Sequence, residues 1–472
     1  MRILFVASEA TPFCKTGGLA DVIGALPVAL HDAGEDVAVV LPAYRVNKYP
    51  GPVREVYLNL RISLGKGYNV NLYECVERGV SFYFVDCAEL YDRPGIYNER
   101  GFDYPDNHLR FSVLCMAALE VSRRLFRAQV LHCHDWQTGL LPVYLRQFFE
   151  NDPTFISSKT LFTIHNLGYQ GFTPASTMVD LGLDPRYFNP AGFEVDGQIN
   201  LLKAGIQFAD SISTVSKRYA QEIQTPEFGF GLDPFLRAKA DTLSGIINGV
   251  DYTEWSPEAD KFIAAEYSVD DLSGKRECKR ALLDEFGLSS EDLGTPLIGI
   301  VSRFADQKGF DLIAEVAHQL AALDLRLVAL GSGEERYERL FQNMAVTYPG
   351  KFAARIGYDN PLAHRIEAGS DMFLMPSRYE PCGLNQIYSL RYGTVPIVRA
   401  TGGLDDTIDE ETGFKFSDYA GWALLSAVES ALSTYADSEK WLKMMRTAMR
   451  KDLSWGASAK EYSALYHRIQ RT

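Results

Sequence analysis

Short apolar segments alternate with helical patterns along the whole chain, and this alternation restricts the possible folds more than any other feature. Short apolar runs separated by helix-length segments are typical of parallel sheets whose helices cross back over them. The candidate strands are Ile3–Ala7, Val37–Leu41, Val80–Val85, Val130–His132, Leu161–Ile164 and Ile212–Val215 in the first half, and Leu297–Val301, Leu325–Leu330, Met372–Met375 and Val395–Val398 in the second. The sequence therefore predicts an α/β protein.

A charged stretch with little β character, roughly Ser256 to Gly294, separates the two series of strands. The Asn248-Gly249-Val250-Asp251 turn just before it is a candidate hinge. We expect two doubly wound, Rossmann-like domains facing a deep cleft, with ligands at the carboxyl ends of the strands. The predicted domains are residues 1–248 and 249–455, followed by residues 456–472 with an amphipathic helix, Ala457–Ile469.

The composition is that of an ordinary globular protein, with 46% hydrophobic and 23% charged residues. A net charge of −14 and an isoelectric point near 5.2 argue against a nucleic acid or an anionic membrane as a partner. The seven cysteines form no C-x-x-C pair, and no apolar run approaches the roughly 18 residues of a membrane span. We therefore expect reduced thiols and a cytoplasmic protein, and leave its oligomeric state open.

A Gly-Gly turn, Lys15-Thr16-Gly17-Gly18-Leu19-Ala20-Asp21-Val22, joins the first candidate strand to a candidate helix. Adjacent glycines let a ligand approach the backbone, and the first N–H groups of a helix favour a phosphate. Such a turn can also serve chain geometry alone. A near-copy, Thr401-Gly402-Gly403-Leu404-Asp405-Asp406, follows a strand far downstream, which suggests two similar halves and one ligand.

Two further segments place charged residues after predicted strands of the second half. Arg303 and Lys308 could converge on a diphosphate, although a solvated charged loop would look the same. In Tyr379-Glu380-Pro381-Cys382-Gly383-Leu384-Asn385, the Glu380 carboxylate is well placed to accept hydrogen bonds from sugar hydroxyls. The alternative is that Glu380 only caps a helix, because a carboxylate is favourable near the first helical turn.

Histidines lie at the ends of two strands of the first half. In the run His132-Cys133-His134-Asp135-Trp136 the two histidines share one face of a strand, so they could bind a metal. No third ligand is evident, and His and Asp at a strand end suit polyol binding equally well. His165, beside Asn166, ends the next strand, and its position favours a functional role over a buried structural one.

Several common motifs are missing. No Asp-x-Asp pair occurs, so the usual device that binds a metal beside a nucleotide-sugar diphosphate is absent. Gly331-Ser332-Gly333 begins like a dinucleotide fingerprint, but Arg336 stands at the third glycine, and there is no P-loop sequence. We therefore expect no metal and no cofactor, with charge on a departing diphosphate met by cations and helix N-termini.

The motifs together resemble the family of bacterial glycogen synthases and plant starch synthases, over nearly the whole chain and in the same order. The resemblance implies the GT-B fold and transfer of glucose, with retention, to the non-reducing end of an α-1,4-glucan such as glycogen. ADP-glucose is the expected donor and UDP-glucose the alternative. The segments that carry the resemblance are Lys15 to Val22, 132–136, 162–166, 248–251, Arg303 with Lys308, 380–384 and 401–404.

The resemblance also implies that the last helix crosses back to the first domain. The first domain would bind the glucan and the second the sugar nucleotide. The expected catalytic residues are His165, Glu380, Arg303 and Lys308. The expected substrate-binding residues are Lys15, Gly17, Gly18, Asp21, Asp135, Asn248, Tyr358, Cys382, Gly383, Leu384, Asn385, Thr401, Gly402 and Gly403.

Two positions depart from the wider pattern. Cys133 replaces a smaller residue between the histidines, and Tyr388 stands where wider retaining relatives have a second Glu. Two other classes of protein remain as alternatives. A non-catalytic two-domain sugar-binding protein would have no reason to gather Lys15, Arg303 and Lys308 around phosphate, and a dehydrogenase is disfavoured by the missing fingerprint.

Overall fold

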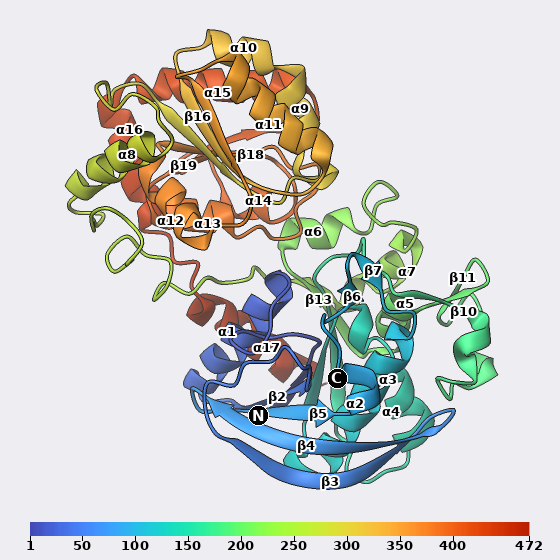
Figure 1. The fold of residues 1–472 in the computed structure, drawn as a ribbon. Helices are drawn as coiled ribbons and strands as arrows, with labels where there is room; N and C mark the ends of the chain where they lie inside the picture. Colours follow the sequence, from blue (N-terminus) through green and yellow to red (C-terminus); the bar gives the residue numbers. More distant parts are fainter. Residues whose placement is uncertain (472) are drawn as a thin grey trace. The chain divides into compact units, whose positions relative to one another are not determined.

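The computed structural model describes residues 1–471, which form two compact units (Figure 1). The first contains Met1–Val215, Ala220–Gly249 and the chain from Trp455 onward, and the second contains Ser216–Tyr219 and Val250–Ser454. The chain thus enters the second unit at Val250 and leaves it after Ser454. These two segments lie side by side, since the Val250 N–H donates to the Leu453 carbonyl over 3.0 Å.

The first unit is built on a nine-stranded sheet in the order β14-β13-β9-β8-β1-β2-β5-β4-β3. It is parallel from β14 to β5, and the long β3–β4 hairpin extends it antiparallel. The strands are β1 Arg2–Val6, β2 Asp36–Pro42, β3 Val53–Ser63, β4 Gly67–Glu77, β5 Val80–Asp86, β8 Val130–His134, β9 Lys159–Ile164, β13 Ser211–Thr214 and β14 Leu243–Gly245.

Helices and short strands complete this unit. The helices are α1 Gly18–Asp32, α2 Ala88–Tyr91, α3 Asn107–Val121, α4 Leu141–Phe149, α5 Leu201–Phe208, α6 Lys217–Glu222 (which begins among the residues grouped with the second unit), α7 Asp233–Ala238 and α17 Trp455–Ile469. The short strands are β6 Asn98–Glu99, β7 Phe102–Asp103, β10 Phe172–Pro174, β11 Glu194–Val195 and β12 Gln198–Asn200.

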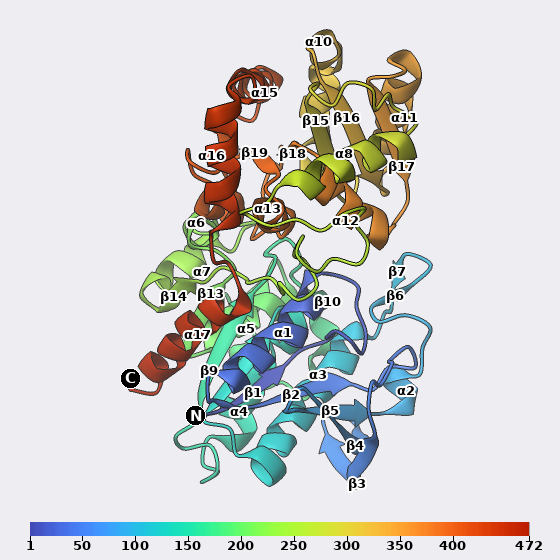
Figure 2. The same cartoon turned by 90° about the vertical axis from the view of Figure 1, so that its left-hand side faces the viewer.

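The C-terminal helix α17 belongs to the first unit and packs beside α1 (Figure 2). Its buried apolar face, with Trp455, Tyr462 and Leu465, joins the cluster that α1 and the strands β1 and β2 form. This confirms the prediction that the last helix returns to the first domain. Burial of this face holds α17 in place, because burying one large apolar side chain contributes about 1.5–3 kcal/mol.

The second unit is a parallel six-stranded sheet in the order β17-β16-β15-β18-β19-β20. Its strands are β15 Leu297–Val301, β16 Arg326–Gly331, β17 Phe352–Ile356, β18 Met372–Met375, β19 Val395–Arg399 and β20 Phe414–Phe416. Its helices are α8 Ser273–Glu285, α9 Phe310–Glu315, α10 Ala317–Ala322, α11 Glu335–Thr347, α12 Asn360–Gly369, α13 Asn385–Arg391, α14 Gly402–Thr407, α15 Gly421–Tyr435 and α16 Ser438–Met449.

Alternate residues of these strands enter two apolar clusters, one on each face of the sheet. Ile298 and Ile300 of β15 pack with helices α9, α10, α11 and α15, whereas Leu297 packs with α8, α12, α13, α14 and α16. This two-residue period is what a strand covered by helices on both faces requires. Both units are therefore Rossmann-like, as predicted.

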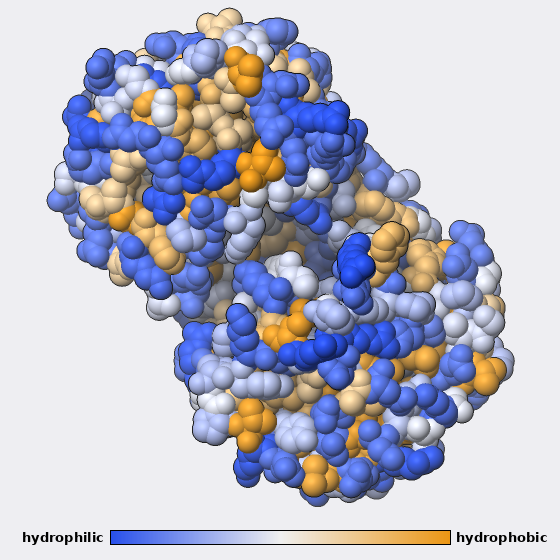
Figure 3. Space-filling model, viewed as in Figure 1, coloured by the Kyte–Doolittle hydropathy of each residue, from blue (hydrophilic) through white to orange (hydrophobic). Residues whose placement is uncertain are grey.

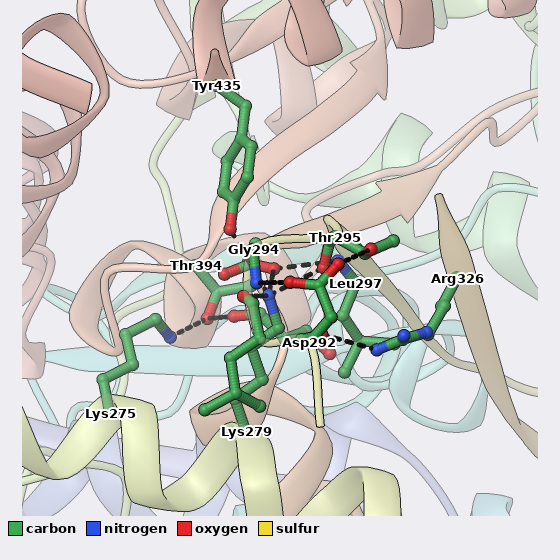
Figure 4. A network of polar contacts seen from close by, with 12 residues as sticks. Lys275, Lys279, Asp292, Gly294, Thr295, Leu297, Arg326, Thr394 and Tyr435 are labelled. Atoms are coloured by element: carbon green, nitrogen blue, oxygen red, sulfur yellow. Dashed lines mark hydrogen bonds and ion pairs between the residues drawn. The ribbon is translucent and has the colours of Figure 1, made fainter. Parts of the chain in front are cut away.

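Two buried lysines hold α8 against the amino-terminal edge of the sheet (Figure 4). The Lys275 ammonium donates to the Thr394 hydroxyl over 2.7 Å, and burial lowers the pKa of Lys275 to about 8. The Lys279 ammonium donates to the Asp371 carboxylate over 2.6 Å and to the Leu293 carbonyl over 2.7 Å. The polar network lies at the edge opposite the predicted site, so it serves the fold.

Every strand predicted from the sequence is present, within two residues at either end. The β3–β4 hairpin, β14, β17, β20 and the short strands were not predicted. Among residues 1–471, no helix has the length and hydropathy that a membrane span requires. The face drawn in Figure 3 is mostly hydrophilic, with apolar side chains in small scattered groups.

Candidate active site

The predicted residues of the first unit follow the carboxyl ends of its parallel strands. The loop with Lys15 follows β1, Asp135 follows β8, His165 follows β9 and Asn248 follows β14. Strands β9, β8 and β1 are direct neighbours in the sheet. Because the carboxyl ends of parallel strands meet at one edge, these residues gather at the same end of this unit.

The predicted residues of the second unit follow the same rule. Arg303 and Lys308 follow β15, Tyr358 follows β17, the run 380–385 follows β18 and the run 401–403 follows β19. Strands β16 and β17 are added on one side of β15, whereas β18, β19 and β20 are added on its other side. The direction in which the sheet grows therefore reverses between β15 and β18. Ligands of doubly wound domains bind at such a reversal.

The Glu9 side chain holds the loop that carries Lys15. Its carboxylate accepts hydrogen bonds from the Thr16 N–H over 2.5 Å and from the Thr16 hydroxyl over 2.9 Å. Burial raises the pKa of Glu9, and these hydrogen bonds act against that rise. The Lys15 ammonium pairs with Asp21 over 2.7 Å, and about half of the Lys15 side chain, 49%, is exposed. Lys15 is thus held by one partner but accessible to a ligand.

The two Gly-Gly turns differ in what surrounds them. A Cβ atom added to Gly18, the first residue of α1, would meet no atom within 4 Å. A Cβ on Gly402 would lie 1.8 Å from the Glu380 carbonyl oxygen, and one on Gly403 would lie 2.0 Å from that of Cys382. The second turn therefore needs glycine to let the segment with Glu380 approach, whereas at the first turn the space beside Gly18 is open.

Lys308 and Glu380 form an ion pair. The Lys308 ammonium donates to the Glu380 carboxylate over 2.6 Å, and the Ser377 hydroxyl donates to the same oxygen over 3.0 Å. Glu380 precedes the first residue of α13, Asn385, by five positions. The reading of Glu380 as a residue of the first helical turn is therefore wrong. Arg303 is exposed, and its guanidinium donates to the Gln307 side chain over 3.3 Å.

His165 contacts a second histidine. Its Nε2 atom lies 2.9 Å from Nδ1 of His134, and the two ring centroids are 5.2 Å apart. Its backbone N–H donates to the Asp135 carboxylate over 2.7 Å. Burial lowers the pKa of His165 to about 3, so the ring is neutral at ordinary pH.

Asp135 has an unusual backbone for a residue with a side chain, with φ of 57°. Non-glycine residues in this region are uncommon and concentrate at functional sites. Its carboxylate accepts N–H groups from His165 and Asn166, which favours the anion, but burial dominates and raises the pKa of Asp135 to about 7. The sequence could not predict this backbone.

The metal-binding alternative for His132 and His134 receives no support. Both nitrogens of His132 have partners, the Thr163 hydroxyl at 2.6 Å and the Tyr466 hydroxyl at 2.8 Å. Within residues 1–471, no three His, Cys, Asp or Glu side chains are grouped so that they could hold a metal ion.

The remaining predicted residues have varied surroundings. Asn385 donates its side-chain N–H to the Val301 carbonyl over 2.6 Å, which ties α13 to the end of β15. The Asn248 side-chain oxygen is buried with no partner among the described residues, and Tyr358 is 87% exposed. Cys382 and Thr401 are buried, and Gly383 has a φ of 71° that favours glycine. Leu384 immediately precedes α13.

Sequence reasoning missed the residues that support the site rather than form it. These are Glu9 at the first loop and Ser377 beside Glu380, while His134 was considered only as a metal ligand or a polyol-binding residue and not as the partner of His165. Each lies within three residues of a strand end, which was the available signal. Their partners, however, were not visible in the sequence.

Comparison with known proteins agrees with this geometry. The family model "Starch synthase catalytic domain" matches residues 2–238, and "Glycosyl transferases group 1" matches residues 286–449. A glycogen synthase from Koribacter versatilis is 50% identical, with 100% of this chain and 99% of the relative covered. One from Myxococcus xanthus is 47% identical, with 99% of each chain covered.

Solved structures agree as well. The catalytic domain of starch synthase IV from Arabidopsis thaliana, bound to ADP and acarbose, has a TM-score of 0.88 at 33% identity and covers 100% of this chain and 99% of its own. A sucrose-phosphate synthase from Thermosynechococcus elongatus, with a TM-score of 0.60, 17% identity and 99% and 98% coverage, shares the fold.

The fold and the residues at the strand ends define a glycosyltransferase of the GT-B class. Within that class, the chain belongs to the glycogen synthase family, which includes the starch synthase catalytic domain. Its activity is that of a glycogen synthase, the elongation of an α-1,4-glucan with glucose from ADP-glucose. This confirms the resemblance and the function predicted from the sequence, while nothing here supports UDP-glucose as an alternative donor.

Proposed function

We propose that the residues at the two sets of strand ends transfer glucose from ADP-glucose to the non-reducing end of glycogen with retention of configuration. The first unit would bind the glucan and the second the sugar nucleotide. The observation that carries this proposal is the ion pair of Lys308 and Glu380 at the point of strand reversal in the second unit. A cation for the phosphate and a carboxylate for the sugar are thereby adjacent.

Lys15, Arg303 and Lys308 would stabilise the departing diphosphate, together with the N–H groups of the Gly-Gly turns. Fixed positive groups that face a leaving group lower the barrier without a rearrangement at the moment of reaction. Arg303 is exposed and Lys15 half-exposed, so both are accessible to a ligand that would replace or join their present partners, Gln307 and Asp21. The absence of any Asp-x-Asp pair is the reason for assigning this task to side-chain cations.

The transferred glucose would be held by Asp135, His165, Asn248, Glu380 and the turn around Gly383. The unpartnered, buried oxygen of Asn248 supports this assignment, because a buried polar atom without a partner is costly unless a ligand satisfies it. The neutral His165 ring would lie against the anomeric carbon, where it adds no charge that would oppose a developing positive one. We propose the same role for the other substrate-binding residues predicted from the sequence, among which Tyr358 is exposed to solvent.

We assign no side-chain nucleophile to the anomeric carbon and therefore propose transfer on one face. The bond from that carbon to the phosphate oxygen breaks as the bond to the acceptor hydroxyl forms. The hydroxyl proton passes to the leaving phosphate oxygen, so the charges balance. Exclusion of water during this step would prevent hydrolysis of the donor. A trapped covalent glucosyl-enzyme would refute this mechanism.

The test offers ADP-glucose and UDP-glucose, each with glycogen and with excess chelator, and measures nucleotide release and chain extension. We expect extension from ADP-glucose at an undiminished rate under chelation. If chelation abolishes activity and a divalent ion restores it, the assignment of diphosphate stabilisation to the three cations is wrong. Nucleotide release without chain extension would point to hydrolysis and contradict the proposed acceptor.

A further inference from the structure

Neither packing nor the proposed reaction explains the surroundings of His134 in the first unit. It lies on β8, fully buried, and contacts His165 on the neighbouring strand end through a single hydrogen bond of 2.9 Å. Its other nitrogen, Nε2, is buried and has no partner among residues 1–471. A buried ring nitrogen without a partner requires an explanation.

The His134 ring is fixed in place. It stacks on Phe5 at 5.3 Å between centroids and packs against the His132 ring at 4.0 Å. His132 is itself bonded at both nitrogens, to Thr163 and to Tyr466 of α17. The ring therefore cannot turn to find another partner for Nε2 without breaking these contacts.

Both His134 and His165 are neutral, because burial lowers both pKa values far below the ordinary range of histidine. Each ring thus carries one proton. In the hydrogen bond between Nδ1 of His134 and Nε2 of His165, one nitrogen donates and the other accepts. The choice decides which atom of each ring carries its proton.

Two arrangements are possible. If His165 donates from Nε2, the proton of His134 is on its own Nε2, where a buried N–H has no acceptor. If His134 donates from Nδ1, only a ring lone pair is left without a partner. Buried N–H groups without an acceptor are rare in native proteins, which favours the second arrangement. The Nδ1 atom of His165 then carries the proton.

We propose that His134 is a positioning residue that holds His165 as the Nδ1–H tautomer, so that His165 offers an N–H to an acceptor oxygen of the bound sugar nucleotide. The proposal rests on the proposed function, which places His165 against the substrate. Nδ1 is the ring nitrogen that His165 has available, because Nε2 is bonded to His134. The opposite tautomer would present a lone pair and accept from a sugar hydroxyl instead.

The first test measures the tautomer directly. The chain has only eight histidines, so ring ¹⁵N labelling gives a simple spectrum, and loss of one set of signals in His165→Ala assigns His165. Protonated and unprotonated ring nitrogens have well-separated ¹⁵N shifts. We expect a protonated Nδ1 and an unprotonated Nε2 in the unaltered protein. A protonated Nε2 in His165 would overturn the proposal, whatever the variants do.

The second test changes His134. His134→Leu removes the donor, and we expect His165 to lose the Nδ1–H tautomer and chain extension to slow by about 10- to 100-fold, as for other groups that orient a functional histidine. His134→Asn keeps a side-chain N–H close to the position of Nδ1, so it should restore the tautomer and most of the rate. Cys133→Ala, a buried change on the same strand, is the matched control and should alter neither.

The outcomes separate this inference from the proposed function. An unchanged His165 spectrum in His134→Leu would overturn the positioning role. Full activity in His165→Ala would refute the substrate contact of His165 instead, even with the expected tautomer. If His134→Leu does not fold, the spectrum of the unaltered protein still tests the proposal, because a protonated Nε2 in His165 overturns it.

Discussion

The ammonium nitrogen of Lys308 lies 2.6 Å from a carboxylate oxygen of Glu380, although 72 residues separate them in the sequence. Their side chains are 19% and 8% exposed, so solvent screens this pair less than a surface pair. Each residue therefore holds the other in place before any ligand arrives. Two residues that we assign to different parts of the substrate are thus not independent.

The ion pair predicts that the effects of Lys308→Ala and Glu380→Ala on turnover do not multiply. Each should lower kcat by about two to three powers of ten, the cost of one missing stabilising donor. The double variant should fall little further, because removal of either residue already leaves the other without its partner. Steady-state kinetics of the three variants measures this.

The control for these three variants is Arg365→Ala. It breaks a different ion pair of the same unit, in which the Arg365 guanidinium lies 2.7 Å from the Glu285 carboxylate. It should leave turnover within about twofold, since a partly exposed pair contributes about 1 kcal/mol or less and only to stability. Near-normal rates in either single variant of Lys308 or Glu380 would remove that residue from the catalytic role. Fully multiplicative losses would contradict the coupling.

The two Gly-Gly turns predict opposite results for the same substitution. Gly18→Ala has open space for its methyl group, so unfolding stability should stay within about 0.5 kcal/mol of the unaltered protein. Activity should nevertheless fall at least about tenfold, because the methyl group would occupy the space that a phosphate approaches. Thermal unfolding measures the stability, and saturation kinetics with the donor measures the activity. Normal kinetics would contradict the predicted loss of activity.

Gly402→Ala should instead destabilise the second unit, because its Cβ would meet the Glu380 carbonyl and its φ of 46° disfavours a side chain. We expect a loss of more than about 2 kcal/mol. Gly287→Ala separates the two causes, since Gly287 also has a positive φ, 66°, but no atom within 4 Å of its Cβ position. Equal losses in both variants would show that the clash with Glu380 contributes nothing.

The strand pattern predicted most of the fold because buried parallel strands are apolar on both faces, as in Leu297–Val301, where alternate residues enter two different clusters. The β3–β4 hairpin escaped prediction because β3 is largely exposed, and its mixed sequence has no clear period. Strand β20 has only three residues, and β17 is interrupted by a charged Arg and mostly partly exposed, so neither forms the continuous apolar run that marks the other strands.

The site was predictable where a residue's type and its place after a strand both indicate chemistry, as for His165 and Lys308. What the sequence could not indicate was which side chains face each other. The contacts of Lys308 with Glu380, and of His134 with His165, join residues from different strand ends, and only the sheet order makes them neighbours. The positive φ of Asp135 was equally invisible.

We predict that the stability of the second unit depends on pH through the titration of Glu367. It is fully buried, and burial raises its pKa to about 8 from an ordinary value of 4.5. A carboxyl group with a raised pKa stabilises the fold in its protonated form, so this contribution is complete below about pH 4.5 and is lost as pH rises towards 8. Glu367→Gln cannot ionise and should avoid that loss.

The stability of Glu367→Gln relative to the unaltered protein should therefore increase between pH 5 and pH 8, by up to about 1.4 kcal/mol per pH unit, and level off above. The attraction of the buried Lys275 ammonium for the Glu367 anion acts against this trend and reduces its size. Denaturant unfolding at several pH values measures the difference. A difference that stays constant with pH would show that Glu367 does not titrate in this range.

We predict that the Tyr466 hydroxyl of the last helix stabilises the first unit in addition to the apolar face of that helix. The hydroxyl lies 2.8 Å from Nδ1 of His132, and both groups are buried. Tyr466→Phe keeps the packing but leaves that nitrogen without a partner, which costs about 1–3 kcal/mol. Lys460→Ala, on the exposed side of α17, is the control and should change stability by less than about 0.5 kcal/mol.

Truncation before Trp455 tests how much the whole helix α17 contributes to the first unit. It removes α17 from the cluster with α1, although the cut lies after the whole second unit in the sequence. We expect the exposed apolar surface to unfold or aggregate the first unit, whereas the second unit, whose apolar clusters contain no residue of α17, should keep its structure. Limited proteolysis should then degrade residues 1–249 and spare 250–454. Equal protection of both segments would mean that α17 contributes little to the first unit.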